Sequence, residues 1–205
     1  MNKNLAREEV VDVVDNVIPN IYALENTEVS NENILKRQSP YRYIKRFMDV
    51  ILATIALVVL SPIFLIIAIA IKIESKGPVF FKHTRIGKNG KIIKLYKFRS
   101  MVINAEDMIN DFTPEQMKEY KENYKLTNDP RITKIGKFLR KTSLDELPQL
   151  LNIIKGDLSI IGPRPVVTDE LEKYGANTEK FLSVTPGLTG YWAANGRSCT
   201  TYKQR

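Results

Sequence analysis

The residues best suited to chemistry are an adjacent carboxylate pair, Asp145 and Glu146, in the stretch TSLDELPQLLNIIKG. In a reaction at phosphorus, one carboxylate can attack a phosphoryl group to form an acyl phosphate. Its neighbour can hold a divalent cation that neutralises the phosphate charge. The pair therefore has the residue types of a phosphoryl-transfer site, with one carboxylate for each task.

This pair lies at the start of a predicted helix, which Gly156 ends. The apolar positions follow helical spacing and are Leu147, Leu150, Leu151 and Ile154. Ser143 and Glu146 match a capping box, but that start puts Pro148 inside the helix, where it loses a hydrogen bond. A start at or near Asp145 keeps Pro148 in the first turn. Either start puts both carboxylates at the positive end of a helix, which favours ionised carboxylates and nearby phosphate.

Two arginines flank the predicted helix. Arg140 precedes it, and Arg164 follows it in the proline-locked sequence GPRP. Guanidinium groups suit phosphate oxygens because they donate two parallel hydrogen bonds. Taken singly, however, an Asp–Glu pair that opens a helix is more often a cap, and GPRP is more often a rigid turn. The residues by themselves leave both interpretations open.

Several classes of catalytic site are excluded by residue counts. The chain has one histidine, His83, and one cysteine, Cys199. An internal disulfide and a cysteine-based zinc cluster are therefore impossible, and serine–histidine triads and haem ligation are disfavoured. Carboxylates and cations must do the chemistry, in a reducing compartment.

The element expected to position these residues begins with an uncharged run of 22 residues, Val50 to Ile71, with Ser61 and Pro62 at its middle. A helix of that length reaches about 33 Å, the thickness of a bilayer's hydrocarbon core. Pro62 removes a backbone N–H and pushes against the Val58 carbonyl, so a bend is expected there.

The flanks of this run decide between three interpretations. Basic residues stand on both sides and are Arg42, Lys45, Arg46, Lys72, Lys76, Lys82 and Arg85. A spanning helix would put one of these clusters on the outer side, against the positive-inside rule. We therefore expect a helix–break–helix hairpin that enters one leaflet and returns, with the carbonyls near Pro62 satisfied by the Ser61 hydroxyl or by packed protein. A kinked spanning helix and a buried core helix are the alternatives.

Charge is distributed unevenly along the chain. Residues 1–39 hold four cations and seven acids, a net charge of −3, so the formal total of +8 leaves +11 on residues 40–205. The basic part suits anionic lipid head groups, nucleotides or nucleic acid. The acidic arm has no long apolar stripe, and we predict a poorly ordered extension there.

Residues 77–205 read as a small domain that mixes strands and helices. VFFKHTRIGKNGKIIKLYKFRSM predicts two strands joined at Asn89 and Gly90, both of which accept positive φ. Residues 105–124 predict a charged helix that is interrupted near Thr113, a cap, and Pro114, a first helical residue. No internal repeat, Walker loop or G-x-G-x-x-G motif is present in the sequence.

From about Tyr43 to Arg205 the chain resembles the bacterial sugar transferase family, the monotopic polyprenyl-phosphate phosphoglycosyl transferases. The matching motifs, in order, are KRFMD (Lys45 to Asp49), the Ser61–Pro62 break, GPVFFKHTRIGKNGK, KFRSM (Lys97 to Met101), DPRITKIGKFLRKTSLDELPQLLNIIKGDLSIIGPRP and PGLTGYWAANGRS.

The resemblance implies a fold and a reaction. The fold is a re-entrant membrane helix over residues 40–76 joined to a small α/β (α+β) catalytic domain, residues 77–205, on the cytoplasmic face of the bacterial inner membrane. In the reaction, an aspartate attacks the β-phosphate of a UDP-sugar, UMP leaves, and polyprenyl (undecaprenyl) phosphate takes the sugar-phosphate. This begins polysaccharide, exopolysaccharide or capsule assembly. No nucleic-acid partner is implied, and paired membrane hairpins would allow a homodimer.

Residue roles also follow from the resemblance. Asp145 matches the nucleophile and Glu146 the Mg²⁺ ligand. The expected phosphate- and nucleotide-binding residues are Arg140, Arg164, Arg99 and Lys97. His83 stands where relatives commonly carry Gln, and we interpret it as a strand residue. Relatives continue with further helices, so we expect either a compact member or a C-terminally shortened one, with residues 1–39 as an extension of its own.

Three competing functions remain to be compared with this one. A membrane-surface scaffold would use only the basic face, but the Asp145–Glu146 pair with both arginines argues against it. A nucleic-acid binder would explain the pI of about 9.4, but not the bilayer-length apolar run. A glycosyltransferase that moves the sugar alone would release UDP instead of UMP.

Overall fold

The computed structural model describes residues 40–123 and 126–195. The chain divides into two compact units, Met1–Ile44 and Lys45–Arg205. Of the first unit, residues 40–44 are described, and they form the start of helix α3. The predicted extension over residues 1–39 and the single cysteine, Cys199, lie outside the described residues.

The described part mixes helices and strands, which confirms the expected class of domain. The longer elements are α3 (Pro40–Val59), α4 (Ser61–Glu74), β1 (Phe80–Ile86), β2 (Ile92–Phe98), α5 (Pro114–Asn123), α6 (Lys134–Thr142) and α7 (Leu150–Lys155). The shorter ones are β3 (Ser159–Ile161), α8 (Thr168–Leu171), α9 (Thr178–Leu182), β4 (Gly187–Thr189) and α10 (Tyr191–Ala194). The 3-10 helices are η2 (Lys88–Gly90), η3 (Asp107–Asp111), η4 (Leu144–Gln149) and η5 (Glu172–Asn177).

The apolar run is broken where its sequence predicts. Helices α3 and α4 meet at Leu60 with a bend of 60°. Pro62 has no N–H to donate to the Val58 carbonyl, and the Ser61 hydroxyl donates to that oxygen instead, at 2.8 Å. The Ser-Pro pair therefore bends the helix without leaving its backbone unsatisfied.

Helices α3 and α4 are apolar, and their lengths decide whether either could cross a membrane alone. Within residues 40–123 and 126–195, no single helix is both long and apolar enough to cross a membrane, whereas α3 and α4 meet the criterion together as a bent pair. The aliphatic and phenylalanine side chains on the pair that are half or more exposed are Ile44, Phe47, Ile55, Val58, Val59, Leu65, Ile66, Ile69 and Ile73.

Strands β1 and β2 form the predicted antiparallel hairpin, with Phe80 opposite Phe98 and Ile86 opposite Ile92. Asn89 (φ 56°) and Gly90 (φ 73°) make the turn, as their sequence indicates. The predicted cap in the next segment also forms, because Thr113 and Gln116 exchange hydrogen bonds at the start of α5, with Pro114 as its first residue.

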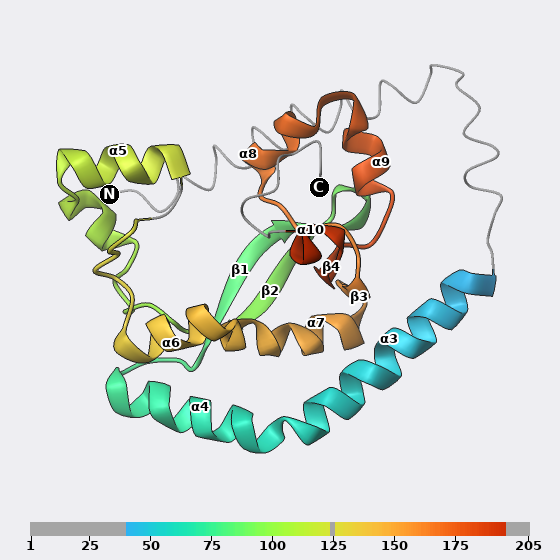
Figure 1. Ribbon diagram of the computed structural model, residues 1–205, viewed down its shortest axis with the longest axis horizontal. Coiled ribbons are helices and arrows are strands. Elements are labelled where there is room, and N and C mark those ends of the chain that lie inside the picture. The colour runs from blue at the N-terminus through green and yellow to red at the C-terminus, as the bar shows by residue number, and fades with distance from the viewer. Residues whose placement is uncertain (1–39, 124–125, 196–205) are drawn as a thin grey trace. The chain divides into compact units, whose positions relative to one another are not determined.

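Two apolar clusters join the bent pair to the rest of the unit. One contains Ala53 of α3, Ile93 and Leu95 of β2, Leu150 and Ile153 of α7, and Leu158. The other contains Ile67 and Ile71 of α4, Phe98 of β2 and Leu139 of α6. Figure 1 shows α6 and α7 between the α3–α4 pair and the hairpin. The apolar pair is therefore part of the domain's own core.

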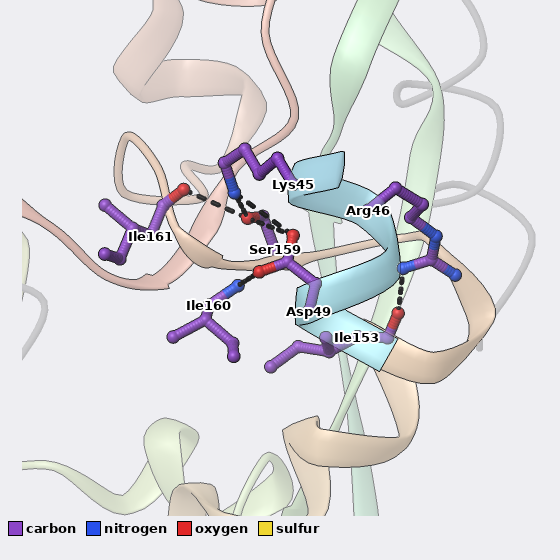
Figure 2. Close-up of polar contacts among 7 residues, drawn as sticks. All are labelled: Lys45, Arg46, Asp49, Ile153, Ser159, Ile160 and Ile161. Atoms are coloured by element: carbon purple, nitrogen blue, oxygen red, sulfur yellow. Dashed lines mark hydrogen bonds and ion pairs between the residues drawn. The ribbon is translucent and has the colours of Figure 1, made fainter. Parts of the chain in front are cut away.

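The first end of the pair is held by the KRFMD motif (Figure 2). The Asp49 carboxylate accepts hydrogen bonds from Lys45 Nζ at 3.1 Å, from Ser159 Oγ at 2.7 Å and from the Ile160 N–H at 3.1 Å. Lys45 also donates to Ser159 Oγ. Arg46 donates to the carbonyl oxygens of Ile153 and Ile154 in the last turn of α7. We call Lys45, Asp49 and Ser159 the anchor lock.

The second end is held by Glu74 and Arg99. Glu74 accepts from the N–H groups of Lys134 at 2.6 Å and Ile135 at 3.1 Å, and so caps the start of α6. Arg99 donates to the carbonyl oxygens of Lys76 at 2.6 Å and Ser75 at 2.9 Å, just beyond α4. The first end of the bent pair is thus bonded to α7 and β3, and the second end to α6 and to the residue that follows β2.

The free edge of β2 is closed by one side chain of α7. Asn152 is fully buried; its amide donates to the Lys94 carbonyl at 2.8 Å and its oxygen accepts from the Tyr96 N–H at 2.9 Å. These bonds replace a third strand, which a two-stranded hairpin needs for independent stability. They also fix α7, and η4 before it, against β2.

The C-terminal part contacts the hairpin at its other end. Strands β3 and β4 pair in parallel, with Ser159 opposite Gly187. The Ile86 N–H, at the end of β1, donates to the Val166 carbonyl at 2.9 Å. That bond brings the segment after GPRP beside the last residues of β1.

Candidate phosphoryl-transfer site

The carboxylate pair lies in the first turn of a 3-10 helix. Ser143 ends α6 with a left-handed φ of 59°, and η4 starts at the next residue with Asp145 and Glu146 in its first turn. Ser143 is the N-cap residue of η4 and Pro148 lies inside η4, as in the capping-box start, but no side-chain cap bond forms at Ser143. Pro148 is tolerated because α7 begins only at Leu150, and Gly156 ends α7 as expected.

Burial in α7 differs in part from the predicted apolar spacing. Leu150 is buried, but Leu151 is 37% exposed, and the other buried positions are Asn152 and Ile153. The 3-10 geometry of η4 turns each residue through a larger angle than an α-helix does, so the face that begins at Leu147 does not continue in phase.

Lys97 is brought to both carboxylates by β2. Its ammonium group lies 2.8 Å from Glu146 Oε1 and 4.0 Å from Asp145 Oδ2. The Glu146 side chain is 36% exposed, whereas that of Asp145 is 11% exposed. The two neighbours therefore differ: one is a solvent-reachable ligand and the other is a nearly buried carboxylate.

Burial raises the pKa of Asp145, and the Glu146 charge adds to the rise, whereas Lys97 and Arg140 oppose it. A buried carboxylate with a raised pKa and specific charge partners is typical of a functional group. The cations keep the ionised form accessible while the surroundings keep water away from it.

Arg140, in the last turn of α6, is held near this carboxylate by its Nε, which donates to Ser100 Oγ at 2.8 Å. Burial lowers the pKa of Arg140, while Asp145 and Asp129 raise it. Helix α6 comes close to β2 because Gly136 lies against the backbone of Ser100: a Cβ there would be 2.0 Å from the Ser100 carbonyl oxygen.

Two of the predicted binding residues are placed differently. Arg99 is 7% exposed and donates to Ser75 and Lys76, so the structure does not bring it to the carboxylates. Arg164 lies over the ring of Trp192, with 5.7 Å from its Cζ to the ring centroid. Lys97, Arg140, Asp145 and Glu146 therefore form the centre of the candidate site.

His83 is a strand residue of β1, as predicted, and the sequence assigned neither it nor Arg85 a role at the site. The pKa of His83 is lowered to about 4 by burial and by the charges of Arg85, Lys97 and Arg140, so its imidazole is neutral at pH 7. Burial lowers the pKa of Arg85. The charge of Arg164 also lowers it, whereas Glu170 and Glu146 raise it. The strand period could have indicated such a role, because His83 and Arg85 are two residues apart and therefore lie on the same face of β1.

The donors present suit Mg²⁺. Within the described ranges, no group of three or more His, Cys, Asp or Glu side chains is placed to hold a metal ion. Mg²⁺, however, is usually bound by one or two carboxylates together with substrate phosphates and water. The adjacent carboxylates of Asp145 and Glu146 match that pattern.

Comparison with known proteins gives the family of the chain. Residues 40–205 match the family described as bacterial sugar transferase. The undecaprenyl-phosphate galactose phosphotransferase of Salmonella typhimurium is 42% identical over 176 residues, which are 84% of this chain and 36% of that protein. The exopolysaccharide production protein ExoY of Sinorhizobium fredii is 48% identical over 164 residues, 78% of this chain and 73% of that protein.

A third relative is the UDP-glucose:undecaprenyl-phosphate glucose-1-phosphate transferase of Escherichia coli, 45% identical over 158 residues, 76% of this chain and 32% of that protein. The chain thus spans little more than a third of the Salmonella protein and about a third of the Escherichia coli one. It belongs to the bacterial sugar transferase family.

Proposed function

We propose that this chain transfers a sugar 1-phosphate from a UDP-sugar to polyprenyl phosphate and releases UMP. The observation that carries the proposal is the nearly buried Asp145 carboxylate beside Glu146, with Lys97 and Arg140 close to it. The names of the Salmonella and Escherichia coli relatives support the two substrate classes, a sugar phosphate and undecaprenyl phosphate.

In the first step, an Asp145 carboxylate oxygen attacks the β-phosphorus of the UDP-sugar. A new carboxyl O–P bond forms, the bond from that phosphorus to the bridging oxygen breaks, and the electron pair leaves with UMP. Lys97 and Arg140 stabilise charge on the phosphoryl oxygens. A raised pKa makes the ionised Asp145 a more basic nucleophile.

In the second step, a phosphate oxygen of polyprenyl phosphate attacks the same phosphorus. The acyl phosphate bond breaks, the electron pair returns to Asp145, and the lipid leaves as a diphosphate-linked sugar. Glu146 would hold Mg²⁺ together with substrate phosphates, and the bound ion would neutralise part of their charge. Partial burial of Asp145 limits the access of water, which would otherwise hydrolyse the acyl phosphate.

The bent pair α3–α4 supports a location at a membrane surface. We propose that it enters the cytoplasmic leaflet of the bacterial inner membrane and returns, with its exposed apolar side chains against lipid. In this proposal, the bonds that tie the pair to β3 and α6 would keep the carboxylates close to the depth of a lipid phosphate. A homodimer of paired anchors stays a prediction.

The test of the reaction is an intact-protein mass measurement on the detergent-solubilised chain with Mg²⁺ and a panel of UDP-sugars, without polyprenyl phosphate. We expect a sugar-phosphate mass gain and release of UMP. Adding polyprenyl phosphate should then remove the added mass and produce lipid diphosphate-sugar.

The informative variant is Asp145→Asn, with Asp107→Asn as the matched control, because Asp107 is an exposed aspartate of η3. The first should form no adduct, and the second should behave as wild type. Release of UDP in place of UMP would make the chain a glycosyltransferase of another kind, and an adduct that persists in Asp145→Asn would assign the nucleophile to another residue.

The topology is tested separately with single cysteines at Arg42 and Lys76 in a Cys199→Ser background. Labelling of both from the same side of sealed vesicles is expected for a re-entrant pair. Labelling from opposite sides would show that the bent pair spans the bilayer.

A further inference from the structure

One face of β1 remains without a role in the proposed reaction. In the hairpin, Arg85 is opposite Ile93, His83 is opposite Leu95, and Phe81 is opposite Lys97. Directly opposed residues of an antiparallel pair share a face of the sheet. The partners on β2 are two core residues and the lysine that binds Glu146, so His83 and Arg85 lie on the face that carries the candidate site.

The end of this face lies beside the segment that follows GPRP. The bond from the Ile86 N–H to the Val166 carbonyl, at 2.9 Å, joins the residue after Arg85 to the residue two after Arg164. The electrostatic neighbours of Arg85 agree with this placement, since they come from both sides: Glu146 from η4, and Arg164 and Glu170 from the later segment. Arg85 therefore interacts electrostatically both with Glu146 of the carboxylate pair and with Arg164.

Burial lowers the pKa of Arg85, and the charge of Arg164 lowers it further, because the two guanidinium groups repel each other. Among the described residues, the Arg85 side chain makes one long hydrogen bond, to the Thr84 carbonyl at 3.4 Å. A phosphate between the two arginines would relieve the repulsion and would use the planar fork of donors that each presents.

His83 adds a different chemistry to the same face. Its imidazole is flanked by Arg85, Lys97 and Arg140, and these charges together with burial keep it neutral at pH 7. A neutral imidazole both donates and accepts a hydrogen bond, which neighbouring cations cannot do. The 47%-exposed ring of Phe81 has its centroid 5.9 Å from that of His83. Cations next to a neutral polar ring and an exposed aromatic ring suit a ligand that has both phosphates and a base.

We propose that Arg85, with Arg164 beside it, is a phosphate-binding residue for the nucleoside diphosphate part of the donor, and that His83 contacts the same bound nucleotide. This inference rests on the proposed function and identifies the surface along which the leaving nucleotide lies. The carboxylates of η4 face the reacting phosphorus from one side, and β1 holds the nucleotide on the other.

The test uses the fact that His83 is the only histidine of the chain. The full chain, purified with a tag that has no histidine and labelled with ¹³C at the histidine ring, gives one ring signal by NMR. Uridine, UMP and UDP are titrated in turn. We expect UDP to move the His83 signal and to bind with a measurable Kd.

Three variants locate the effect. Arg85→Ala should weaken UDP binding about 10- to 100-fold, the value of a charge-assisted hydrogen bond to phosphate, and should change uridine binding much less. Arg85→Lys should fall between it and wild type, because it retains the charge and loses the fork. The control is Lys82→Ala, which removes a cation from the opposite face of the same strand, where Lys82 lies over Tyr96; UDP binding should stay within about 2-fold.

The outcomes separate this inference from the proposed function. If UDP binds the wild type while the His83 signal stays in place and Arg85→Ala binds normally, the inference is wrong and the proposed function stands. Equal loss of uridine and UDP binding in Arg85→Ala would mean a collapsed site, which also overturns a phosphate role. If the wild type binds no UDP at all, the proposed function fails with it.

Discussion

The anchor lock allows a quantitative prediction for Asp49→Ala. Asp49 lies in the middle of α3, and its side chain is 9% exposed. Alanine is a better helix former than aspartate, so the change favours α3 itself by a few tenths of a kcal/mol or more. Any loss of stability must then come from the contacts of Asp49 with the segment at Ser159.

The size of the loss follows from the groups left behind. The Ile160 N–H loses its acceptor, which costs about 1–3 kcal/mol when the group is buried. Ser159 Oγ is less affected because its single proton can be donated to the Ile161 carbonyl, at 3.0 Å, once Asp49 is gone. Lys45 is 32% exposed and regains water, so its loss is about 0.5–1 kcal/mol. Together these losses come to about 1.5–4 kcal/mol, and the gain in helix propensity reduces the expected total to about 1–3.5 kcal/mol.

For a chain of 205 residues, each kcal/mol corresponds to roughly 2–4 °C, so the apparent Tm in detergent should fall by about 2–14 °C. Ser159→Ala should have a smaller effect, since Asp49 would keep Lys45 and Ile160. Asp107→Ala, which removes an exposed carboxylate, should stay within about 0.5 kcal/mol of wild type.

The same contacts of Asp49 determine how the stability of the fold depends on pH. Burial alone raises the pKa of Asp49, but the hydrogen bonds from Ser159, Lys45 and the Ile160 N–H outweigh it and hold the pKa below 3.8. Because the pKa of Asp49 is lower in the folded state than in the unfolded state, its ionised form stabilises the fold at pH values above the unfolded-state pKa. This contribution is lost as the pH falls. The Tm difference between wild type and Asp49→Ala should therefore be full above pH 3.8 and shrink below it. A Tm change no larger than that of the Asp107 control at pH 7 would refute the reasoning.

Three further predictions concern the site. The pKa of His83 is expected at about 4 by NMR titration, and because its unfolded value is 6.5, stability should fall as the pH drops from 6.5 towards 4 in wild type and not in His83→Gln; a measured pKa of 6 or more would contradict this. Asp145→Asn should form no adduct. Because burial raises the pKa of Asp145, its ionised form costs stability, so Asp145→Asn should have a higher Tm than wild type at pH 8, and the Tm difference should close near pH 4. An unchanged Tm at pH 8 would oppose the buried placement of this carboxylate. Gly136→Ala should destabilise by about 1–3 kcal/mol despite the gain in helix propensity, since its Cβ would meet the Ser100 carbonyl oxygen at 2.0 Å; a Tm equal to or above that of wild type would show that α6 can move away.

Local features were predictable from the sequence because short-range physics determines them. Pro62 requires a bend, Asn89 and Gly90 accept positive φ, and Thr113 offers an oxygen to the first turn of α5. The class of domain and the position of the carboxylate pair at the start of a helical turn followed in the same way. Each depends on a few neighbouring residues.

Features that depend on distant residues were not predictable in the same way. From the sequence, Asn152 is a polar residue of an amphipathic helix. Its role at the edge of β2 depends on Lys94 and Tyr96, which precede it in the chain by 58 and 56 positions. Arg85 lies in a strand whose residues are mostly exposed, so no alternation of apolar residues marked its inner face. Arg99 resembles a substrate ligand by type, but the end of α4 provides it with carbonyl acceptors.

The anchor lock also orders events during synthesis. Asp49 leaves the ribosome 110 residues before Ser159, which at about 5–20 residues per second is an interval of roughly 5–20 s. During that interval, the apolar side chains of the bent pair have none of the later core, such as Leu139 and Ile153, to cover them. With the membrane location proposed above, the pair would reach the bilayer first, and the nascent domain would fold onto a helix that is already held there.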